Sequence, residues 1–226
     1  LDENDALAWN TKGVINQNIG NHEDALKSFE KALTLDENNV KIMNKISVEL
    51  AELGRFDESK KILMDIILID KFHVWAWSNL ASVYATGDLN YTKSLECSSI
   101  GLYLDPDNTV ALLAHVIALN SLKKYPEALK FLDHLLHVDK DLESLKPSNI
   151  HDYQVMLMRA ELLIRANFEP EASEYIDEIL SKNILKGADL VTCLRKKFLL
   201  LYTSGDNEKV INCCNEILAI DGNHAE

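Results

Sequence analysis

Glycine and proline are scarce in this 226-residue chain, which holds 8 of the first and 4 of the second. Folds rich in strands and tight turns use both residues heavily, so these counts argue against an all-β or loop-rich protein. Long apolar runs are also lacking, because the most apolar one, 62–69, is interrupted by Asp65 and is too short to cross a bilayer. The abundant Leu, Ala, Glu, Lys and Ile instead favour helices packed around a sizeable core.

Positive charge is the next deficit, since 23 Lys and Arg face 36 Asp and Glu and the formal net charge is −13. Proteins that bind nucleic acid need a positive field to displace the counterions of phosphate, and anionic membranes repel an acidic protein. We therefore expect neither a nucleic acid nor a membrane as partner, and a protein or peptide that is basic or neutral. A local basic patch at Arg195, Lys196 and Lys197 is more simply a solvated helix face.

Cysteine is limited to four residues, with no C-x-x-C pair among them: Cys97, Cys193, Cys213 and Cys214. Reduced thiols in a reducing compartment fit this pattern better than disulfides or zinc ligands, and they predict a cytoplasmic location. His134 and His137 have a spacing that suits a metal, but no acidic or thiol ligand clearly converges on them. The sequence therefore predicts no metal site.

Signatures of catalysis and of cofactor binding are missing as well. Gly13 and Gly20 are the nearest pair of glycines and lie seven residues apart, which rules out a dinucleotide loop or a P-loop. No G-x-S-x-G motif occurs. We expect a protein that is not an enzyme and carries no cofactor.

An internal repeat is what the chain does have. An aliphatic residue followed by aspartate recurs at spacings of 34, 34, 35 and 34 residues, with the aspartates at positions 2, 36, 70, 105 and 139. Gly20 and Gly54 keep the same period, and so do Trp9, Met43 and Trp77. Each period predicts two amphipathic helices, in the first case Ala6 to about Asn18 and about Glu23 to Leu35, joined by a turn at Gly20.

Residues within this period resemble the tetratricopeptide repeat, whose pattern is W-x2-L-G-x2-Y, then A-x3-F. Trp9, Gly13, Ala25, Phe29 and Ala32 match the pattern, whereas the Leu and Tyr places are occupied by lysine and asparagine. The resemblance implies an all-α fold, a right-handed α-solenoid of antiparallel helix–turn–helix units. It divides residues 1–142 into the tail of a preceding unit and units 6–39, 40–73, 74–108 and 109–142. Residues 143–152 are predicted to be a linker, and 153–226 to form two degenerate units.

In that family the first helices of the units line a concave groove that binds partners. Carried over to units two to four, the groove residues would be Asn44, Val48, Trp75, Asn79, Ser82, Val110, Leu113 and Ile117. Trp77 takes the packing position, so Trp75 faces elsewhere, either towards a partner as an anchor or against the preceding unit. Of the asparagine and lysine places used by two specialised branches of the family, only Asn79 is retained, so neither specialised activity is expected.

These observations predict a non-catalytic scaffold that binds a protein or peptide in the concave groove. Two alternatives stay open. The chain could be a regulatory or targeting segment of a larger protein whose effector domain lies elsewhere. It could also self-associate end to end, because neither end carries the polar cap that a solenoid needs.

Overall fold

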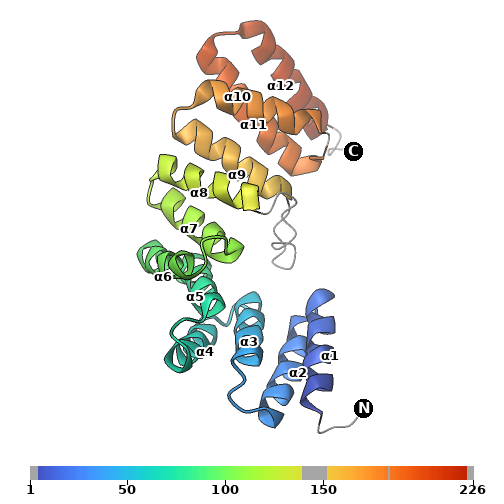
Figure 1. Cartoon of the computed structure of the whole chain (residues 1–226). Helices are drawn as coiled ribbons and strands as arrows, with labels where there is room; N and C mark the ends of the chain where they lie inside the picture. Colours follow the sequence, from blue (N-terminus) through green and yellow to red (C-terminus); the bar gives the residue numbers. More distant parts are fainter. Residues whose placement is uncertain (1–4, 139–151, 183, 223–226) are drawn as a thin grey trace. The chain divides into compact units, whose positions relative to one another are not determined.

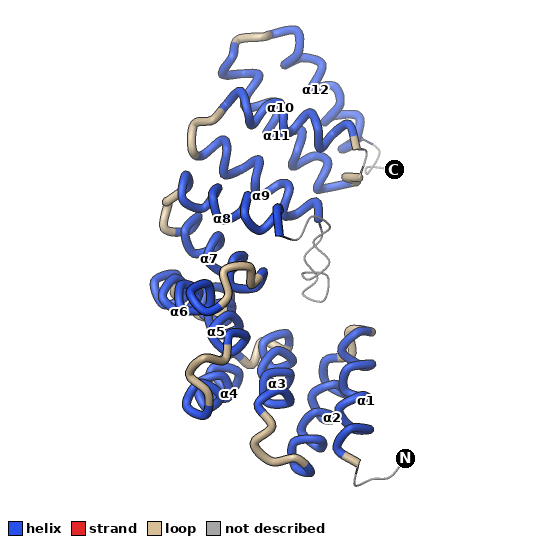
Figure 2. Tube along the Cα trace, viewed as in Figure 1, coloured by secondary structure: helices blue, strands red, loops and turns tan. Residues whose placement is uncertain are grey.

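The computed structural model describes residues 5–138, 152–182 and 184–222, which form twelve helices and no strand (Figure 1). The predicted linker 143–152 lies outside the described residues except for Asp152, as do the first four residues of the predicted tail. Short loops join successive helices from α1 to α8 (Figure 2). The helices are α1 Ala6–Asn18, α2 His22–Leu35, α3 Val40–Glu52, α4 Phe56–Ile69, α5 Val74–Thr86, α6 Tyr91–Leu104, α7 Thr109–Ser121, α8 Tyr125–Val138, α9 Asp152–Arg165, α10 Glu169–Ser181, α11 Gly187–Ser204 and α12 Asn207–Gly222.

The chain divides into two compact units, residues 1–147 and 148–226. In the first unit each of the helices α1 to α8 packs against the next one, and α5 also contacts α3 and α7. In the second unit α9 packs on α10, α10 on α11 and α11 on α12. The all-α helical repeat fold that the period predicts is thereby confirmed.

Side-chain caps start the first helix of each pair in the first unit. Asp5, Asn39, His73 and Asn108 precede α1, α3, α5 and α7, and each side chain accepts a hydrogen bond from a backbone N–H of the first turn. Such a cap stabilises a helix by about 0.5–2 kcal/mol, because it satisfies donors that have no partner inside the helix. The recurring aspartate, asparagine and histidine thus fix where each repeat begins.

Turns of three residues separate the helices of the first, second and fourth pairs, at 19–21, 53–55 and 122–124, whereas the third pair has four residues, 87–90. Gly20 and Gly54 adopt left-handed φ angles of 76° and 74°, which a glycine accepts without strain. The extra residue of unit 74–108 therefore lies in the turn between α5 and α6.

The core of the first two repeats centres on Phe29, whose side chain is 0% exposed. Its ring lies so close to Gly13 that a Cβ there would stand 2.4 Å from Phe29 Cε1. Ala25, Leu26 and Ile46 complete the same buried cluster, with Trp9 packed at its edge. The glycine of the repeat motif is therefore needed because the second helix packs closely against the first one. It is not needed for a turn.

Helix α7 carries a buried histidine, His115. His115 Nδ1 is 2.9 Å from Ser98 Oγ, and the imidazole ring lies 4.2 Å from the ring of Phe131. Burial lowers the pKa of His115 from its ordinary 6.5, and the charge of Glu127 opposes this only in part. The folded protein therefore binds a proton at His115 less readily than the unfolded chain does. The contribution of neutral His115 to stability is complete above about pH 6.5 and is lost as the pH falls through the lower pKa of the folded state.

We therefore expect the free energy of unfolding of the first unit to fall between pH 7.5 and 5.5, and to fall less steeply in His115→Leu. Ser98 keeps a hydrogen bond in that variant because its hydroxyl donates to the carbonyl of Leu95. Denaturant melts at several pH values measure the slope, with the exposed His137→Leu as the matched control. An equal slope in wild type and His115→Leu would assign the pH dependence to other groups.

Candidate protein-binding surface

The eight residues predicted to bind a partner all lie on first helices of the first unit. We call them the first-helix surface: Asn44 and Val48 on α3, Trp75, Asn79 and Ser82 on α5, and Val110, Leu113 and Ile117 on α7. Since α5 contacts both α3 and α7, the three helices form one continuous layer. Residues spaced by one repeat are thereby brought next to one another.

Trp75 is the most exposed member of this surface, with 48% of its area accessible. Trp77 is partly buried in the neighbouring core, where its indole N–H donates to the carbonyl of Lys71 at 2.9 Å. At 100° per residue, the stripe of Trp75, Asn79 and Ser82 lies roughly 170° from that of Trp77, Leu80 and Tyr84. Of the two readings open for Trp75, its exposure favours an anchor for a partner.

Polar side chains link the first helices of successive repeats. Asn79 Nδ2 donates to Asn44 Oδ1 at 3.0 Å, and Lys45 Nζ donates to Asn10 Oδ1 at 2.9 Å. The Lys45 amine also lies 5.4 Å from the centre of the Phe29 ring, and burial lowers the pKa of this lysine. Both bonds span 35 residues, so they hold neighbouring repeats in register.

Leu113 departs from the expectation for the surface because it is only 7% exposed. Helix α7 is apolar along most of its length and has nine buried residues, so it is enclosed by its neighbours more completely than α3. Leu113 consequently packs in the core and offers little area to a partner. Asn44, Val48, Asn79, Ser82, Val110 and Ile117 are half-buried.

Comparison with known proteins agrees with this arrangement. The family model "Tetratricopeptide repeat" matches residues 6–39. Among solved structures, PilF of Pseudomonas aeruginosa superposes with a TM-score of 0.74 at 14% identity, over 95% of this chain and 90% of that one. A thermophilic tetratricopeptide protein from Thermus thermophilus gives 0.65 at 15% identity, over 87% of this chain and 100% of that one. The chain therefore has the fold of tetratricopeptide-repeat proteins, and its first helix pair matches the family model itself.

Two curated relatives are considerably longer than this array. Superkiller protein 3 of Schizosaccharomyces pombe is 24% identical over 204 residues, which are 86% of this chain and 14% of the relative. Human tetratricopeptide repeat protein 7B is 28% identical over 94 residues, which are 42% of this chain and 11% of the relative. The chain therefore spans about a seventh or less of the length of either relative. Tetratricopeptide repeats in general mediate contacts between proteins.

A third pair of first helices is linked in the same way, and this link was not predicted from the sequence. In the second unit, Lys196 Nζ on α11 donates to Glu161 Oε2 on α9 at 3.1 Å, and Arg165 pairs with the same glutamate. The bond again spans 35 residues, as do Lys45–Asn10 and Asn79–Asn44. A search for polar residues one repeat apart on first helices would have found all three pairs.

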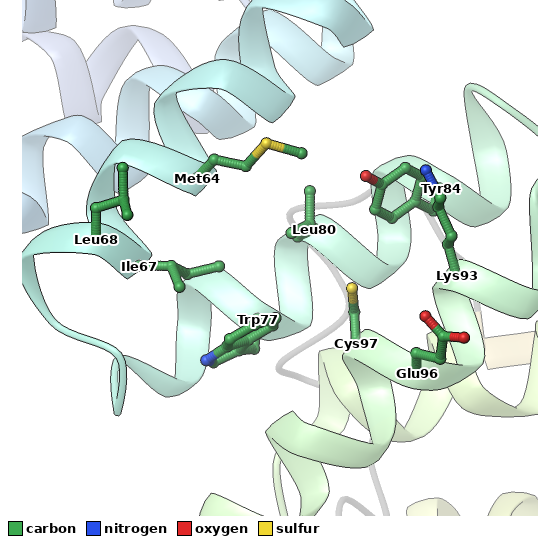
Figure 3. A pocket seen from close by; sticks show the side chains of 9 residues that line it. All are labelled: Met64, Ile67, Leu68, Trp77, Leu80, Tyr84, Lys93, Glu96 and Cys97. Carbon is green, nitrogen blue, oxygen red and sulfur yellow. The ribbon is translucent and has the colours of Figure 1, made fainter.

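A groove is lined by the stripe of α5 that carries Trp77, Leu80 and Tyr84 (Figure 3). It encloses about 480 Å³ between the second helices α4 and α6, with α5 as its floor, and we call it the α4–α6 groove. Its lining is mostly apolar: Met64, Ile67 and Leu68 from α4, Trp77, Leu80 and Tyr84 from α5, and Lys93, Glu96 and Cys97 from α6. This groove was not predicted from the sequence, because its lining comes mainly from second helices and from the buried stripe of α5.

The remaining candidates for reactive or metal-binding side chains include two buried cysteines and His134. Burial raises the pKa of the Cys97 and Cys193 thiols to about 11, which keeps them in their unreactive protonated form. His134 Nε2 lies 2.8 Å from Asp107 Oδ1, and the described residues contain no cluster of three side chains arranged to hold a metal. Within those residues, no helix has the length and apolar character needed to span a membrane.

Proposed function

We propose that this tetratricopeptide array is a non-catalytic scaffold that binds a peptide or a segment of another protein along its first-helix surface. The observation that carries the proposal is the exposed indole of Trp75 beside a hydrogen-bonded pair of asparagines. Aromatic side chains of this kind dominate the energy of protein interfaces, and amide side chains bind the backbone of an extended peptide. Val48, Val110 and Ile117 would add an apolar border on either side.

The net charge of −13 supports a basic or neutral partner, because an acidic surface attracts cations at a distance and repels anions. The same balance argues against nucleic acid and membranes as partners. The four cysteines are free thiols, three of them buried, which supports a location in the reducing cytoplasm. No cofactor or catalytic step is part of the proposal.

A screen of short peptides of varied charge tests this function, followed by affinity measurements on the tightest binder. Trp75→Ala should weaken binding by about tenfold or more, because hot-spot side chains contribute about 2 kcal/mol. Its unfolding transition should stay nearly unchanged, since the side chain is half exposed. Phe72→Ala removes an exposed ring outside the first-helix surface and should bind as the wild type does. If Trp75→Ala also binds like the wild type, the surface has been assigned wrongly.

A role as one segment of a larger protein is the second candidate, and the small share of each curated relative that the chain covers favours it. The array would then position an effector domain on the partner. Comparing the partner-dependent activity of the full-length protein with that of a form lacking these residues would decide between the two roles.

Self-association is favoured by apolar side chains on the terminal helices. Leu7, Ile15 and Ile19 are exposed on or just after α1, and Ile211 and Leu218 on α12. Stacking α12 of one copy on α1 of another would cover both faces. Light scattering over a concentration series distinguishes this role, because a strict monomer would exclude it.

A further inference from the structure

The α4–α6 groove lies where a side chain on α6 is small and its counterparts on α4 and α8 are large; the first repeat has the small Ser28 at this place. Counted from the helix start, Cys97 takes the place that Ile62 takes in α4 and Phe131 takes in α8. Ile62 packs against the core clusters on both of its sides, and Phe131 lies against the ring of His115. At both neighbouring positions a large side chain thus contributes to the contact between repeats, whereas the small thiol of Cys97 lines the α6 wall of the groove (Figure 3).

The rim of the groove is apolar on one wall. On α4, Leu68 is 84% exposed and Met64 is 44% exposed, although both border a cavity lined by Trp77 and Leu80. Exposed apolar side chains around a cavity of this size are typical of a site that a partner covers. The thioether of Met64, the thiol of Cys97 and the indole of Trp77 form a lining that suits an aromatic ring, since sulfur and aromatic groups attract one another.

The charges at the rim indicate which groups would lie next to that ring. Lys60 is already neutralised by Asp57 at 2.9 Å and Asp88 at 2.7 Å. The amine of Lys93, in contrast, lies 5.3 Å from the centre of the Tyr84 ring and forms no ion pair with a carboxylate among the described residues. Lys93 can therefore receive a carboxylate from a partner. Glu96, one turn further along α6, would repel a second one.

We propose that the α4–α6 groove is a second binding site, for a segment of a partner protein that inserts one aromatic side chain over Cys97 and places a carboxylate on Lys93. The site lies on the face of α5 opposite to Trp75, so it is independent of the function proposed above. The array would hold two different segments at once, a basic or neutral one on the first-helix surface and an acidic aromatic one in the groove.

Designed peptides test this site directly. The probe is an alanine-rich helical peptide with one tryptophan and a glutamate one turn away, and two matched peptides replace the tryptophan with alanine or the glutamate with lysine. The first peptide should shift the methyl NMR signals of Met64 and Leu68 and bind at least tenfold more tightly than either matched peptide. Equal binding of the glutamate and lysine peptides would overturn the assignment of Lys93.

Five variants of the array locate the binding. Cys97→Phe, which copies the residue of α8, should fill the groove and abolish binding of the probe, and Lys93→Glu should weaken it at least tenfold. The exposed Lys130→Glu, on α8, and Trp75→Ala should leave it unchanged. Met64→Glu keeps the test valid if Cys97→Phe does not fold, because Met64 is partly exposed and its replacement should still abolish binding. Retained binding in Met64→Glu would overturn the proposal.

Two other outcomes would also overturn the proposal. If the signals of Met64 and Leu68 shift with protein concentration in the absence of any peptide, a second copy of the chain fills the groove. If Trp75→Ala abolishes binding of the probe while Met64→Glu retains it, the peptide occupies the first-helix surface instead.

Discussion

Phe29→Ala is expected to cost about 3–5 kcal/mol, the largest loss from any single substitution considered for this array. The ring is fully buried between α1 and α2 and against α3, and Gly13 has no side chain that could move into the space it would leave. Denaturant unfolding measures the loss. Tyr103→Ala is the control, since that ring is largely exposed and its removal should change stability by less than about 0.5 kcal/mol.

Because repeat proteins are stabilised by contacts between neighbours, the damage should stay local. Backbone NMR signals of α1 and α2 should broaden or move in Phe29→Ala, while those of α7 and α8 stay in place. A Gly13→Ala change should also destabilise the pair, and Phe29→Leu should relieve part of that cost in the double variant, because a smaller side chain leaves room for the new methyl group. Independent, additive effects would show that the contact between positions 13 and 29 does not determine the packing.

Removing both partners of Glu49 should have the second largest effect. This carboxylate on α3 is 0% exposed, accepts a hydrogen bond from Gln17 Nε2 at 2.6 Å and lies 2.9 Å from His22 Nδ1. It therefore ties α3 to both helices of the first repeat. The double variant Gln17→Ala and His22→Ala should lose about 3–5 kcal/mol, because it strands a buried charge. Glu49→Leu should lose clearly less, since Gln17 and His22 are only half-buried and can turn to water.

The cost of that double variant should depend on pH. Burial raises the pKa of Glu49 above its ordinary 4.5, and the hydrogen bonds with His22 and Gln17 offset this rise only in part. The stabilisation from a group with a raised folded pKa is complete below about pH 4.5 and is lost as the pH rises through that higher value. Without its two partners the pKa of Glu49 rises further, so the loss should be greatest at pH 7 and shrink towards pH 5. Unfolding at both pH values measures it, and a loss that does not change with pH would contradict a charged Glu49.

The helices of this protein were predictable because local sequence determines them. The first helix was predicted to run from Ala6 to about Asn18 and does so, and the second begins at His22, one residue earlier than predicted. Caps, left-handed glycines and apolar stripes all act within one or two turns of helix, so the period of 34 residues carries this information. The extra residue of the third repeat lies in the turn after Thr86, where it leaves the pattern within both helices intact.

Features between repeats were not predicted because they depend on how closely neighbouring units pack. Leu113 was assigned to the binding surface by its place in the repeat, yet the apolar environment of α7 buries it. Glu49 lies on the same stripe as Ile42 and Ile46, which suggests burial, but its partners on α1 and α2 follow only from the fold. The α4–α6 groove is lined by Cys97, which is smaller than Ile62 and Phe131 at the same place of the neighbouring repeats, and the contrast is visible only once these positions are known to be equivalent.

The order of packing along the chain also bears on how the protein is made. In each unit, the helices that share extensive contacts are neighbours or next neighbours in sequence. Such contacts close short loops, which favours rapid folding and does not require the end of the chain to be present. Each helical hairpin can therefore pack on the preceding hairpin as soon as its own residues leave the ribosome. The apolar face of a hairpin then stays exposed only for the time needed to synthesise the next one.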